Sequence, residues 1–485
     1  MKKIKSSSLK SISFAFFVLI NWCSLHNTAS AQVNSSPYSR YGIGDVSPKG
    51  FEQSFAMGGT NIALQNDTTA MFFINNGNPA SYSNIRLTTA DIGLNFNSLQ
   101  LQNTSAKQTI NNASFAHLSL ALPFKKWWVG SFGLTPFSSV GYKVSNDEVI
   151  ENVGDVNFLY QGTGGINQAY FGNSIKPLYW LPNHFLKSRR YERLKEAKKF
   201  TKTNRILKRK KSWDALSLGL NASYLFGGFT DARSSIFPYG MNAFNARTTT
   251  TTRVGDVYLD YGAQYSYTFD SIRGHELKEK VKVLFGATFA AQSNVNAKID
   301  SLSYTYFTNS SGYNVPKDTI QNSQNAKGKL RFPLSFGFGL GFKIGDRWLV
   351  AADYAVQNWS TYQVFGLAQG LNNSMRVSLG IQYVPNSKAS GKGTYFKRIN
   401  YRIGGRYNQT MVEINNTPLI EQAVSMGLGL PVGRNFLLQN FSMMNIGVEL
   451  GQRGTTANGL IKEQFFNVTF GVTINDRWFV KPKFD

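Results

Sequence analysis

The 485-residue sequence is poor in the groups that catalysis and metal binding use most. It has one cysteine, Cys23, which excludes a disulfide within the chain, and only four histidines. After residue 31 no run of eighteen consecutive apolar residues occurs, which argues against helical membrane spans. Acidic residues are also scarce, at 27 against 52 Lys and Arg. What is abundant is glycine and aromatic residues, with 44 Gly, 37 Phe, 23 Tyr and 8 Trp, a composition that favours β structure.

The first 31 residues have the layout of a secretory signal peptide. A lysine-rich start precedes an apolar stretch at about 12–22, and a small-residue site ends at Ala31. The apolar stretch is too short to remain as a transmembrane helix. We therefore expect cleavage after Ala31, which removes Cys23 and four lysines and lowers the formal net charge from +25 to +21.

Strict alternation with a period of two recurs along the chain. In residues 332–344, FPLSFGFGLGFKI, the large apolar side chains share one face, and the glycines, Pro333, Ser335 and Lys343 share the other. The same division recurs at 216–224, 376–383, 444–451 and 466–474. Each of these segments therefore predicts a strand with one apolar face and one polar or small-residue face.

A soluble antiparallel sandwich also alternates, but two features favour a membrane barrel. The segments approach the length of about nine to eleven residues that a tilted strand needs to cross a bilayer. Aromatic residues also cluster beside tight polar turns, as in 124–128, 346–348 and 475–478, which fits rings lying at the headgroup level. We expect a closed all-β transmembrane antiparallel barrel in the outer membrane, because an open sheet edge in lipid leaves backbone groups unpaired.

About fourteen strands are predicted between residue 86 and the C terminus, so the domains expected are a signal peptide at 1–31, an N-terminal lumenal hatch or plug at 32–85, and the barrel at 86–485. Connections such as 125–126 and 432–435 are expected as short periplasmic turns. The polar stretch 294–328 is expected as a long extracellular loop. The predicted strands lie near 86–101, 111–124, 127–142, 157–175, 213–228, 252–269, 279–293, 329–344, 347–361, 374–385, 395–411, 420–431, 436–451 and 462–475.

A basic insertion is expected at 182–213, within a periplasmic turn. Residues 187–211 carry thirteen Lys or Arg against two Glu. In an exported protein this charge favours anionic lipid or an acidic periplasmic or outer-membrane protein partner bound through 183–211, and not nucleic acid; a solvated insertion with no partner is the alternative. The residues predicted to make such contacts are Arg189, Arg190, Arg193, Lys198, Lys199, Lys208, Arg209, Lys210 and Lys211.

The chain resembles the FadL-type transporters of long-chain fatty acids and other hydrophobic molecules. The resemblance rests on a hatch-like N-terminal motif and on "RFPLSFGFGLGFKIGDRWLVAADYAVQNWS", with its Asp353 and Trp359-Ser360. The extra residues before Asn-Pro-Ala, the opening "SPYSRYGIGD" and the basic insertion depart from the family pattern. The hatch motif consists of Gly58, Gly59, Asn78, Pro79 and Ala80, with further matches at Ala63, Asn66-Asp67 and 70–73.

The resemblance implies passive import of a hydrophobic ligand through a hatch-gated lumen. Hatch aromatics, among them Phe55, Phe72 and Phe73, would line an apolar slot, and Arg402 or Arg406 would bind a carboxylate. The aromatics could instead pack the hatch against the wall, and the arginines could pair with residues such as Asp353 or Glu449. The departures leave a second class of function open, a non-transporting accessory subunit of an outer-membrane assembly or secretion complex.

No catalytic site, cofactor or metal site is expected. His117 and Ser119 would share the lumenal face of one strand, but the sequence offers no recognisable third residue to orient a triad. No cysteine and no metal-ligand spacing follow the expected leader. The sequence therefore predicts a membrane protein that is not an enzyme. It either transports a hydrophobic ligand or docks into an outer-membrane complex.

Overall fold

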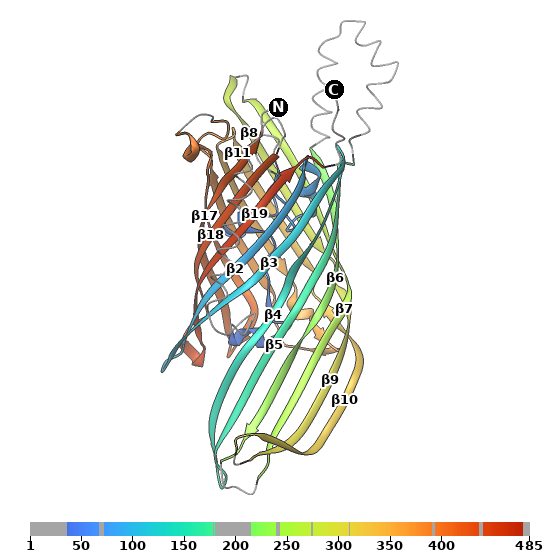
Figure 1. The fold of residues 1–485 in the computed structure, drawn as a ribbon, viewed down its shortest axis with the longest axis vertical. Coiled ribbons are helices and arrows are strands. Elements are labelled where there is room, and N and C mark those ends of the chain that lie inside the picture. The colour runs from blue at the N-terminus through green and yellow to red at the C-terminus, as the bar shows by residue number, and fades with distance from the viewer. Residues whose placement is uncertain are drawn as a thin grey trace, which may run out of the picture. The chain divides into compact units, whose positions relative to one another are not determined.

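The computed structural model describes residues 36–66, 72–177, 179, 215–238, 243–272, 275–309, 311–389, 393–435 and 440–478. The signal peptide and the basic insertion predicted from the sequence lie outside these residues. Among the described residues, no helix is both long and apolar enough to cross a bilayer. The described chain is dominated by antiparallel strands (Figure 1).

Fourteen wall strands close into a barrel, as the alternation predicts. The last strand pairs with the first over their whole length, from Lys462 opposite Gln102 to Asp476 opposite Thr88, which closes the wall. The wall strands in chain order are β2 (Thr88–Gln102), β3 (Lys107–Lys125), β4 (Trp128–Ile150), β5 (Gly154–Ile175), β6 (Leu216–Ile236), β7 (Asn245–Ile272), β8 (His275–Ala290) with β9 (Ser293–Thr308), β10 (Asn314–Phe332) with β11 (Ser335–Ile344), β12 (Trp348–Gln357), β15 (Ser374–Tyr383), β16 (Asn400–Ile414), β17 (Thr417–Asn435), β18 (Asn440–Arg453) and β19 (Lys462–Asp476).

The apolar faces predicted from the alternation point outward, as β11 shows. Phe336, Phe338 and Phe342 of β11 are 45%, 60% and 42% exposed, as lipid-facing side chains should be. The glycines between them face inward, where a side chain on Gly337 or Gly339 would collide with Ile62 of the N-terminal segment. The small-residue face predicted from the sequence therefore makes room for a plug.

The N-terminal segment forms that plug inside the barrel. Its elements are short, and many of its residues are buried. They are η1 (Pro37–Arg40), β1 (Asp45–Val46), α2 (Glu52–Phe55) and η2 (Pro79–Asn84). We call residues 50–85 the hatch; residues 36–48 lie further along the lumen and pair with β4.

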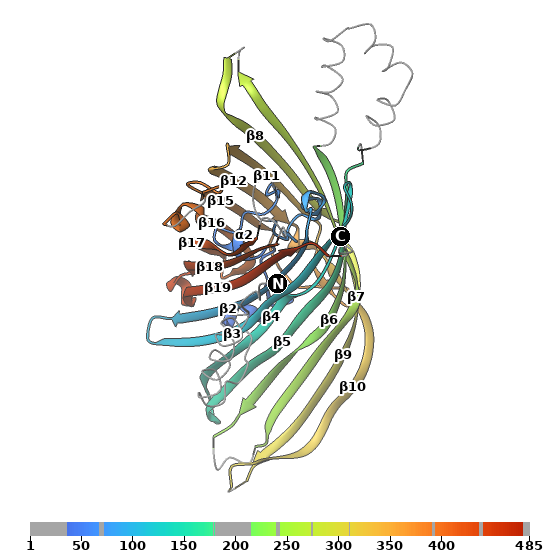
Figure 2. The same cartoon turned by 45° about the horizontal axis from the view of Figure 1, so that its top comes forward.

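The strands β4 to β7, β9 and β10 continue far beyond the rest of the wall (Figure 1). β7 has 28 residues, or about 90 Å at the usual rise, against a hydrocarbon core of about 30 Å. β9 and β10 pair as a hairpin, so the expectation of a loop at 294–328 is wrong. We call the outer parts of β4 to β7 with β9 and β10 the extended sheet; Figure 2 shows it curving away from the other strands.

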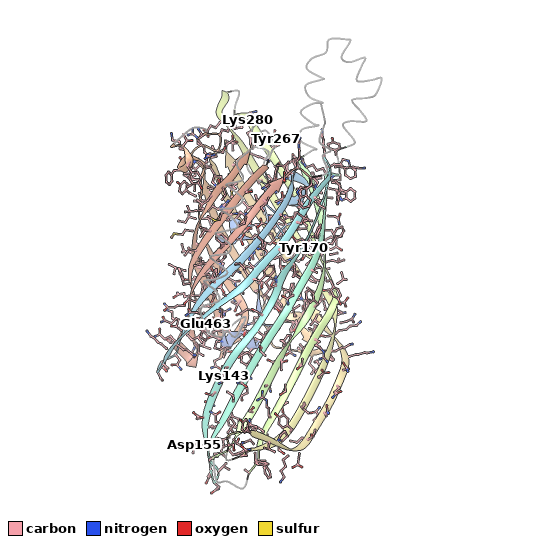
Figure 3. The ribbon with its side chains drawn as sticks, viewed as in Figure 1. Lys143, Asp155, Tyr170, Tyr267, Lys280 and Glu463 are labelled. Atoms are coloured by element: carbon pink, nitrogen blue, oxygen red, sulfur yellow. The ribbon has the colours of Figure 1, made fainter. Side chains whose placement is uncertain are left out.

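The wall bends where the extended sheet begins. Positive φ angles at Gly164 (116°) and Gly227 (109°) mark this level on β5 and β6, and only glycine adopts such angles without strain. The same level carries the break between β8 and β9 and the break at Pro333 between β10 and β11. Lys143 and Asp155, beyond the bend, lie at the opposite end of the barrel from Tyr267 and Lys280 (Figure 3).

On the usual polarity of bacterial barrels, with short turns in the periplasm, the end bearing the tight turns at 126–127 and 345–347 is periplasmic and the extended sheet is extracellular. One predicted turn, 432–435, is instead the end of β17. The remaining short elements lie in connections: η3 (Trp359–Thr361), β13 (Gln363–Val364), β14 (Leu367–Ala368), η4 (Tyr395–Arg398) and η5 (Ala457–Gly459).

Candidate functional site

A cavity of about 340 Å³ lies in the lumen between the hatch and an apolar cluster. This volume is within the range of small-molecule sites in proteins. Hatch residues such as Phe51, Glu52 and Phe55 line one side, and Tyr258, Phe332 and Trp359 line the other. What the cavity can bind therefore depends on these two boundaries and on the wall between them.

The hatch is seated on wall glycines. Gly58 has a φ of +70°, and a side chain there would come within 2.5 Å of the Gly405 carbonyl oxygen of β16. Its backbone N–H donates to Ser425 Oγ at 2.8 Å. Gly59 has a φ of +81° but faces open space, so only its backbone angle requires glycine. The Gly-Gly motif thus forms a tight turn whose first residue touches the wall.

The Asn-Pro-Ala motif fixes the other end of the hatch. Asn78 caps η2 by accepting from the Ala80 N–H at 3.1 Å, and its amide donates to the Ile62 carbonyl at 2.8 Å. Pro79 opens the helix, where its missing N–H costs nothing. Ser174 of β5 donates to the Ala80 carbonyl at 2.9 Å. The motif therefore serves hatch structure and wall contact.

Asp353 of β12 holds the middle of the hatch. Its Oδ2 accepts from the backbone N–H groups of Asn61 (2.6 Å) and Ile62 (2.9 Å), and the side chain is 3% exposed. Its Oδ1 has no hydrogen-bond partner within the described part of the chain. Because a buried carboxylate that accepts two N–H groups is strongly oriented, Asp353 is a latch between wall and hatch.

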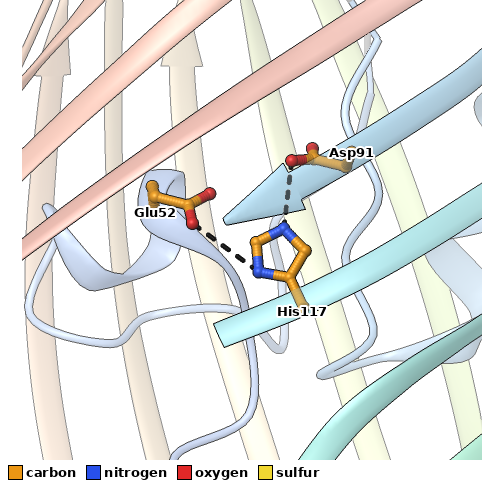
Figure 4. Close-up of side chains that lie close together, drawn as sticks. All are labelled: Glu52, Asp91 and His117. Carbon is orange, nitrogen blue, oxygen red and sulfur yellow. Dashed lines mark hydrogen bonds and ion pairs between the residues drawn. The ribbon is translucent and has the colours of Figure 1, made fainter. Parts of the chain in front are cut away.

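A second latch joins α2 to β2 and β3. His117 lies between two carboxylates, with Nε2 3.1 Å from Asp91 Oδ1 and Nδ1 3.6 Å from Glu52 Oε1 (Figure 4). Phe51 stacks on the imidazole at 3.6 Å between centroids. Burial raises the pKa of Glu52 to about 7, while His117 opposes that rise.

The three side chains are close enough to be considered as metal ligands. However, the two ring nitrogens of His117 face different carboxylates, so the imidazole bridges them, and one metal ion would take only one nitrogen. Asp91 Oδ2 also accepts from Thr473 at 2.9 Å. The geometry is that of a hydrogen-bonded latch.

Three cations of the cavity wall are paired. Lys49 binds Asp260 at 2.6 Å, Arg406 binds both Glu421 and Glu449, and Arg453 binds Asp45 and Glu463. Arg376 of β15 also lines the cavity. Among the described residues it makes no hydrogen bond or ion pair. Asp353, on the neighbouring strand, is the carboxylate with the largest electrostatic effect on it.

The apolar boundary closes the lumen toward the extracellular side. Phe332 is 1% exposed and stacks on Phe137 at 5.7 Å, with Tyr258 at 5.9 Å edge-on. Tyr38 and Ile43 of the N-terminal segment join the same cluster. We call this cluster the apolar seal.

The backbone ladder of the wall is interrupted between β3 and β4. Their pairing covers only the stretch from Leu118 opposite Leu134 to Lys125 opposite Trp128. Among the described residues no ladder pair joins 107–117 of β3 to 135–150 of β4, and we call this unpaired boundary the seam. A bulge at Ala116 and another at Phe137 bend the two strands at the point where they part.

The cavity extends to the seam. Ala116 and His117 of β3, and Thr135 and Phe137 of β4, are among the residues that line it. Just beyond them, β1 pairs with the edge of β4, Asp45 opposite Ser139 and Val46 opposite Ser138. The N-terminal segment therefore covers the outer part of the seam and leaves its inner part beside the cavity.

The ligand residues predicted from the sequence are only partly brought together. Phe55 lines the cavity, but Phe72 is buried among Tyr82 and Ile85, and Phe73 packs against Met57. Arg402 donates to Gln382 and Asn445 and does not line the cavity. Arg406 lines it but is taken up by Glu421 and Glu449, so the ion-pair alternative describes it. Arg376 was missed.

A hydrolase site does not form at His117. Ser119 accepts from Tyr170 at 2.9 Å, and both nitrogens of His117 face carboxylates. The basic residues proposed to contact a partner, Arg189 to Lys211, lie outside the described residues.

The fold is that of FadL-like outer-membrane channels. It is similar to the toluene transporter TbuX of Ralstonia pickettii (TM-score 0.51, 12% identity, covering 89% of this chain and 99% of that one). It is also similar to a FadL homologue of Pseudomonas aeruginosa (0.51, 10%, 90% and 99%) and to the toluene transporter TodX of P. putida (0.50, 13%, 91% and 100%). These are transport proteins and not enzymes.

No curated protein matches the sequence. The family model described as BamG matches residues 9–181 and 210–485. The two matched ranges cover nearly the whole chain and leave out 182–209, which is the core of the basic insertion.

Proposed function

The chain belongs to the BamG family, and from its FadL-like fold and lumenal cavity we propose that it passes small hydrophobic molecules across the outer membrane without energy input. The observation that carries the proposal is the cavity that meets the seam. A cavity of about 340 Å³ beside an interruption of the wall ladder is expected for a transporter, whereas a barrel that serves only as a scaffold does not require one.

The route that fits these contacts is sideways. The hatch is held by Asp353 and by the Glu52–His117–Asp91 latch, so opening it means breaking buried charged contacts. Among the described residues no β3–β4 ladder has to break at the seam, and β1 pairs with β4 only over its outer part. A hydrophobic molecule that enters through the apolar seal would therefore leave into the membrane more easily than through the hatch.

The ligand class is small and largely apolar. Long-chain fatty acids, which the sequence resemblance implied, are one member of that class, and the toluene transporters of the same fold are named for a smaller one. The cavity volume sets the limit for a wholly enclosed ligand.

The test is entry of the uncharged dye N-phenyl-1-naphthylamine into intact cells that lack the chromosomal gene and carry the protein or a variant. Ala116→Trp places a large side chain at the bulge beside the cavity, and we expect dye entry to fall to the level of cells without the protein. Ala113→Trp lies on the same strand with an exposed side chain and should leave entry unchanged. Equal entry in all four strains would rule the proposal out.

A second function is favoured by the extended sheet. Its border strands, β4 and β10, have outer edges that pair with no strand among the described residues: 143–150 of β4 pairs only with β5, and 314–328 of β10 pairs only with β9. Exposed strand edges are common sites of protein contact. This supports the alternative of an accessory subunit of an outer-membrane complex.

The two functions separate in native mass spectrometry of protein extracted gently from its own membranes, with and without residues 183–211. Bound hydrophobic ligand with no protein partner in either form supports transport. A stoichiometric partner supports the accessory role. A partner that is kept after the deletion would point to the barrel or the extended sheet. A partner that is lost would assign the contact to the insertion, whose residues 182–209 the family match omits.

A further inference from the structure

The two borders of the extended sheet differ in how well they are protected against pairing with another strand. Among the described residues, 143–150 of β4 pairs only with β5, and 314–328 of β10 pairs only with β9. The two strands lie at opposite sides of the sheet (Figure 2). On the polarity given above, both borders lie outside the cell, so a partner would reach them from there.

The chain itself caps each border at its base. β1 pairs with β4 at Ser138 and Ser139. On the other border, β13 pairs with β10 at Leu330 and Arg331. Strand addition to these borders is therefore already used within the molecule, and it stops where the free stretches begin.

The free border of β10 carries features that hinder strand addition. Its ladder with β9 has three register shifts between Pro316 and Ala326, and Asn325 has a φ of +55°. Pro316 has no N–H to donate, and Lys327 is charged and exposed. Proline, lysine and irregular pairing on an edge strand are devices that keep other strands from adding to it. This border is therefore protected.

The free border of β4 lacks these features. Its ladder with β5 runs from Ser138 to Ile150 without a register shift. After Lys143 the stretch contains neither proline nor lysine, and Val149 is 77% exposed. The stretch is also longer than the average strand of about five to six residues. A regular and unprotected edge of this kind is one to which an extended segment can add.

The unpaired backbone groups of this border can be assigned. The Phe137 carbonyl accepts from the Ser47 N–H at 3.0 Å, and the Gly141 N–H donates to Ser39 Oγ at 3.1 Å. Odd-numbered residues of β4 thus turn their N–H and C=O groups away from β5. Above the cap made by the N-terminal segment, these residues are Lys143, Ser145, Asp147 and Val149, and all four are exposed.

The same border is acidic. Asp147 and Glu148 lie on the free stretch, and Glu151 and Asp155 follow at the turn to β5, against Lys143 alone. Opposite charges on facing strands stabilise their pairing, whereas like charges directly opposite each other destabilise it. A strand that adds here should therefore be basic.

From these observations we propose that residues 143–150 of β4 are a docking edge, and that they take a basic extended segment of another cell-surface protein as an added strand. The added strand would run antiparallel to β4, as β1 does, and would continue the line that β1 begins. A second copy of this chain fits less well, because its extended sheet offers only the same acidic edge or the protected border of β10. The proposal rests on the accessory function proposed above and names its contact surface.

The test is binding of a short synthetic peptide of alternating lysine and valine to the full chain in phosphatidylcholine nanodiscs, measured by fluorescence anisotropy with empty nanodiscs subtracted. One matched peptide has glutamate in place of lysine. The other keeps the lysines but is N-methylated at every second residue, which removes the donors of one edge. We expect the basic peptide to bind at least about tenfold more tightly than either of them.

Three variants locate the contact. Ser145→Pro removes one outward N–H and leaves the ladder with β5 intact, so it should weaken the basic peptide at least about tenfold. Asp147→Lys does not alter the backbone and should weaken it about threefold. Gln324→Pro is the matched control on the other border, at a register shift where Gln324 pairs with no residue of β9. It should leave the affinity within about twofold.

Equal affinities for the basic and the N-methylated peptide, or an equal loss in Ser145→Pro and Gln324→Pro, would overturn the docking edge alone. The accessory function would fail separately, if native mass spectrometry found no stoichiometric partner.

The occupant is tested with Ser145→Cys, because the chain has no other cysteine after residue 31. We expect no disulfide-linked homodimer after mild oxidation of membranes that contain this variant. A homodimer would show that a second copy fills the edge and would overturn the assignment to another protein.

Discussion

The lumen is closed at two levels by seals of opposite chemistry. The hatch is held by charged and backbone hydrogen bonds, such as those of Asp353 to Asn61 and Ile62. The apolar seal is held by packing of rings, such as Phe332 on Phe137. Buried charged contacts require one geometry, whereas apolar side chains repack around another apolar group at lower cost.

This difference indicates which seal a ligand can displace. A hydrocarbon chain can replace the contacts of Phe332 or Tyr258 with its own, because dispersion and burial are not directional. It offers nothing in exchange for the hydrogen bonds of Asp353. We therefore expect the apolar seal to yield and the hatch to remain, and the next four changes test that contrast.

Asp353→Ala should have the largest effect on the hatch. It removes two hydrogen bonds to a buried carboxylate, which together stabilise the docked hatch by about 4 kcal/mol. Hydrogen exchange of the Asn61 and Ile62 amides should accelerate accordingly. Asp353→Asn, which can still accept from one N–H, should exchange at an intermediate rate; unchanged exchange in both would mean that the latch is unimportant.

Phe332→Ala should weaken the apolar seal by about 3 kcal/mol, because the ring is 1% exposed and its removal leaves a cavity. Entry of the naphthylamine dye into cells should become faster, with hatch exchange unaffected. Phe338→Ala, six residues on and 60% exposed to the outside, is the matched control and should leave dye entry as it was.

Gly58→Ala and Gly59→Ala separate wall contact from backbone angle. Both residues have positive φ, so each substitution costs about 1 kcal/mol in strain. Gly58→Ala also pushes a methyl group into the backbone of Gly405, which should cost about 2 kcal/mol more. Trypsin cleavage after Lys49 should speed up clearly more in the first variant. Equal rates would show that the wall contact is unimportant.

The smallest effect is a pH dependence of the second latch. Burial raises the pKa of Glu52 from 4.5 to about 7, so the docked state binds an extra proton between these values. Hatch stability should therefore be full below about pH 4.5 and fall as pH rises through 7.

Asp91, His117 and Arg402 face Glu52 from β2, β3 and β16, so the titration belongs to this group of residues as a whole. Glu52→Gln should keep the hatch docked and flatten the dependence of amide exchange on pH between 5 and 8, after correction for intrinsic exchange rates. A slope that is the same in both proteins would remove Glu52 from the explanation.

The strands of the wall were predictable from the sequence because alternate residues of a strand point to opposite faces, so the apolar pattern shows which face meets lipid. The glycines of 337–341 and the phenylalanines between them fixed which side meets lipid and which meets the plug. The β9–β10 hairpin was missed because residues 314–329 are polar and exposed on both faces, so no period of two appears.

The site was less predictable because it depends on pairing between distant segments. Glu52, Asp91 and His117 come from three elements, and nothing local in the sequence shows that they meet. Arg376 was missed for a related reason: sequence reasoning cannot show which of several lumenal arginines has a carboxylate within reach. Alternation did indicate that it faces the lumen, and that signal could have added it beside Arg402 and Arg406.

The most direct test of the central claim is a crystal structure of the protein with 10-bromodecanoate, located by the anomalous scattering of bromine. The account predicts the bromine inside the cavity beside Tyr258 and Phe332, with the hatch still bound to Asp353. A cavity that stays empty at saturating ligand, while the barrel is intact, would contradict it.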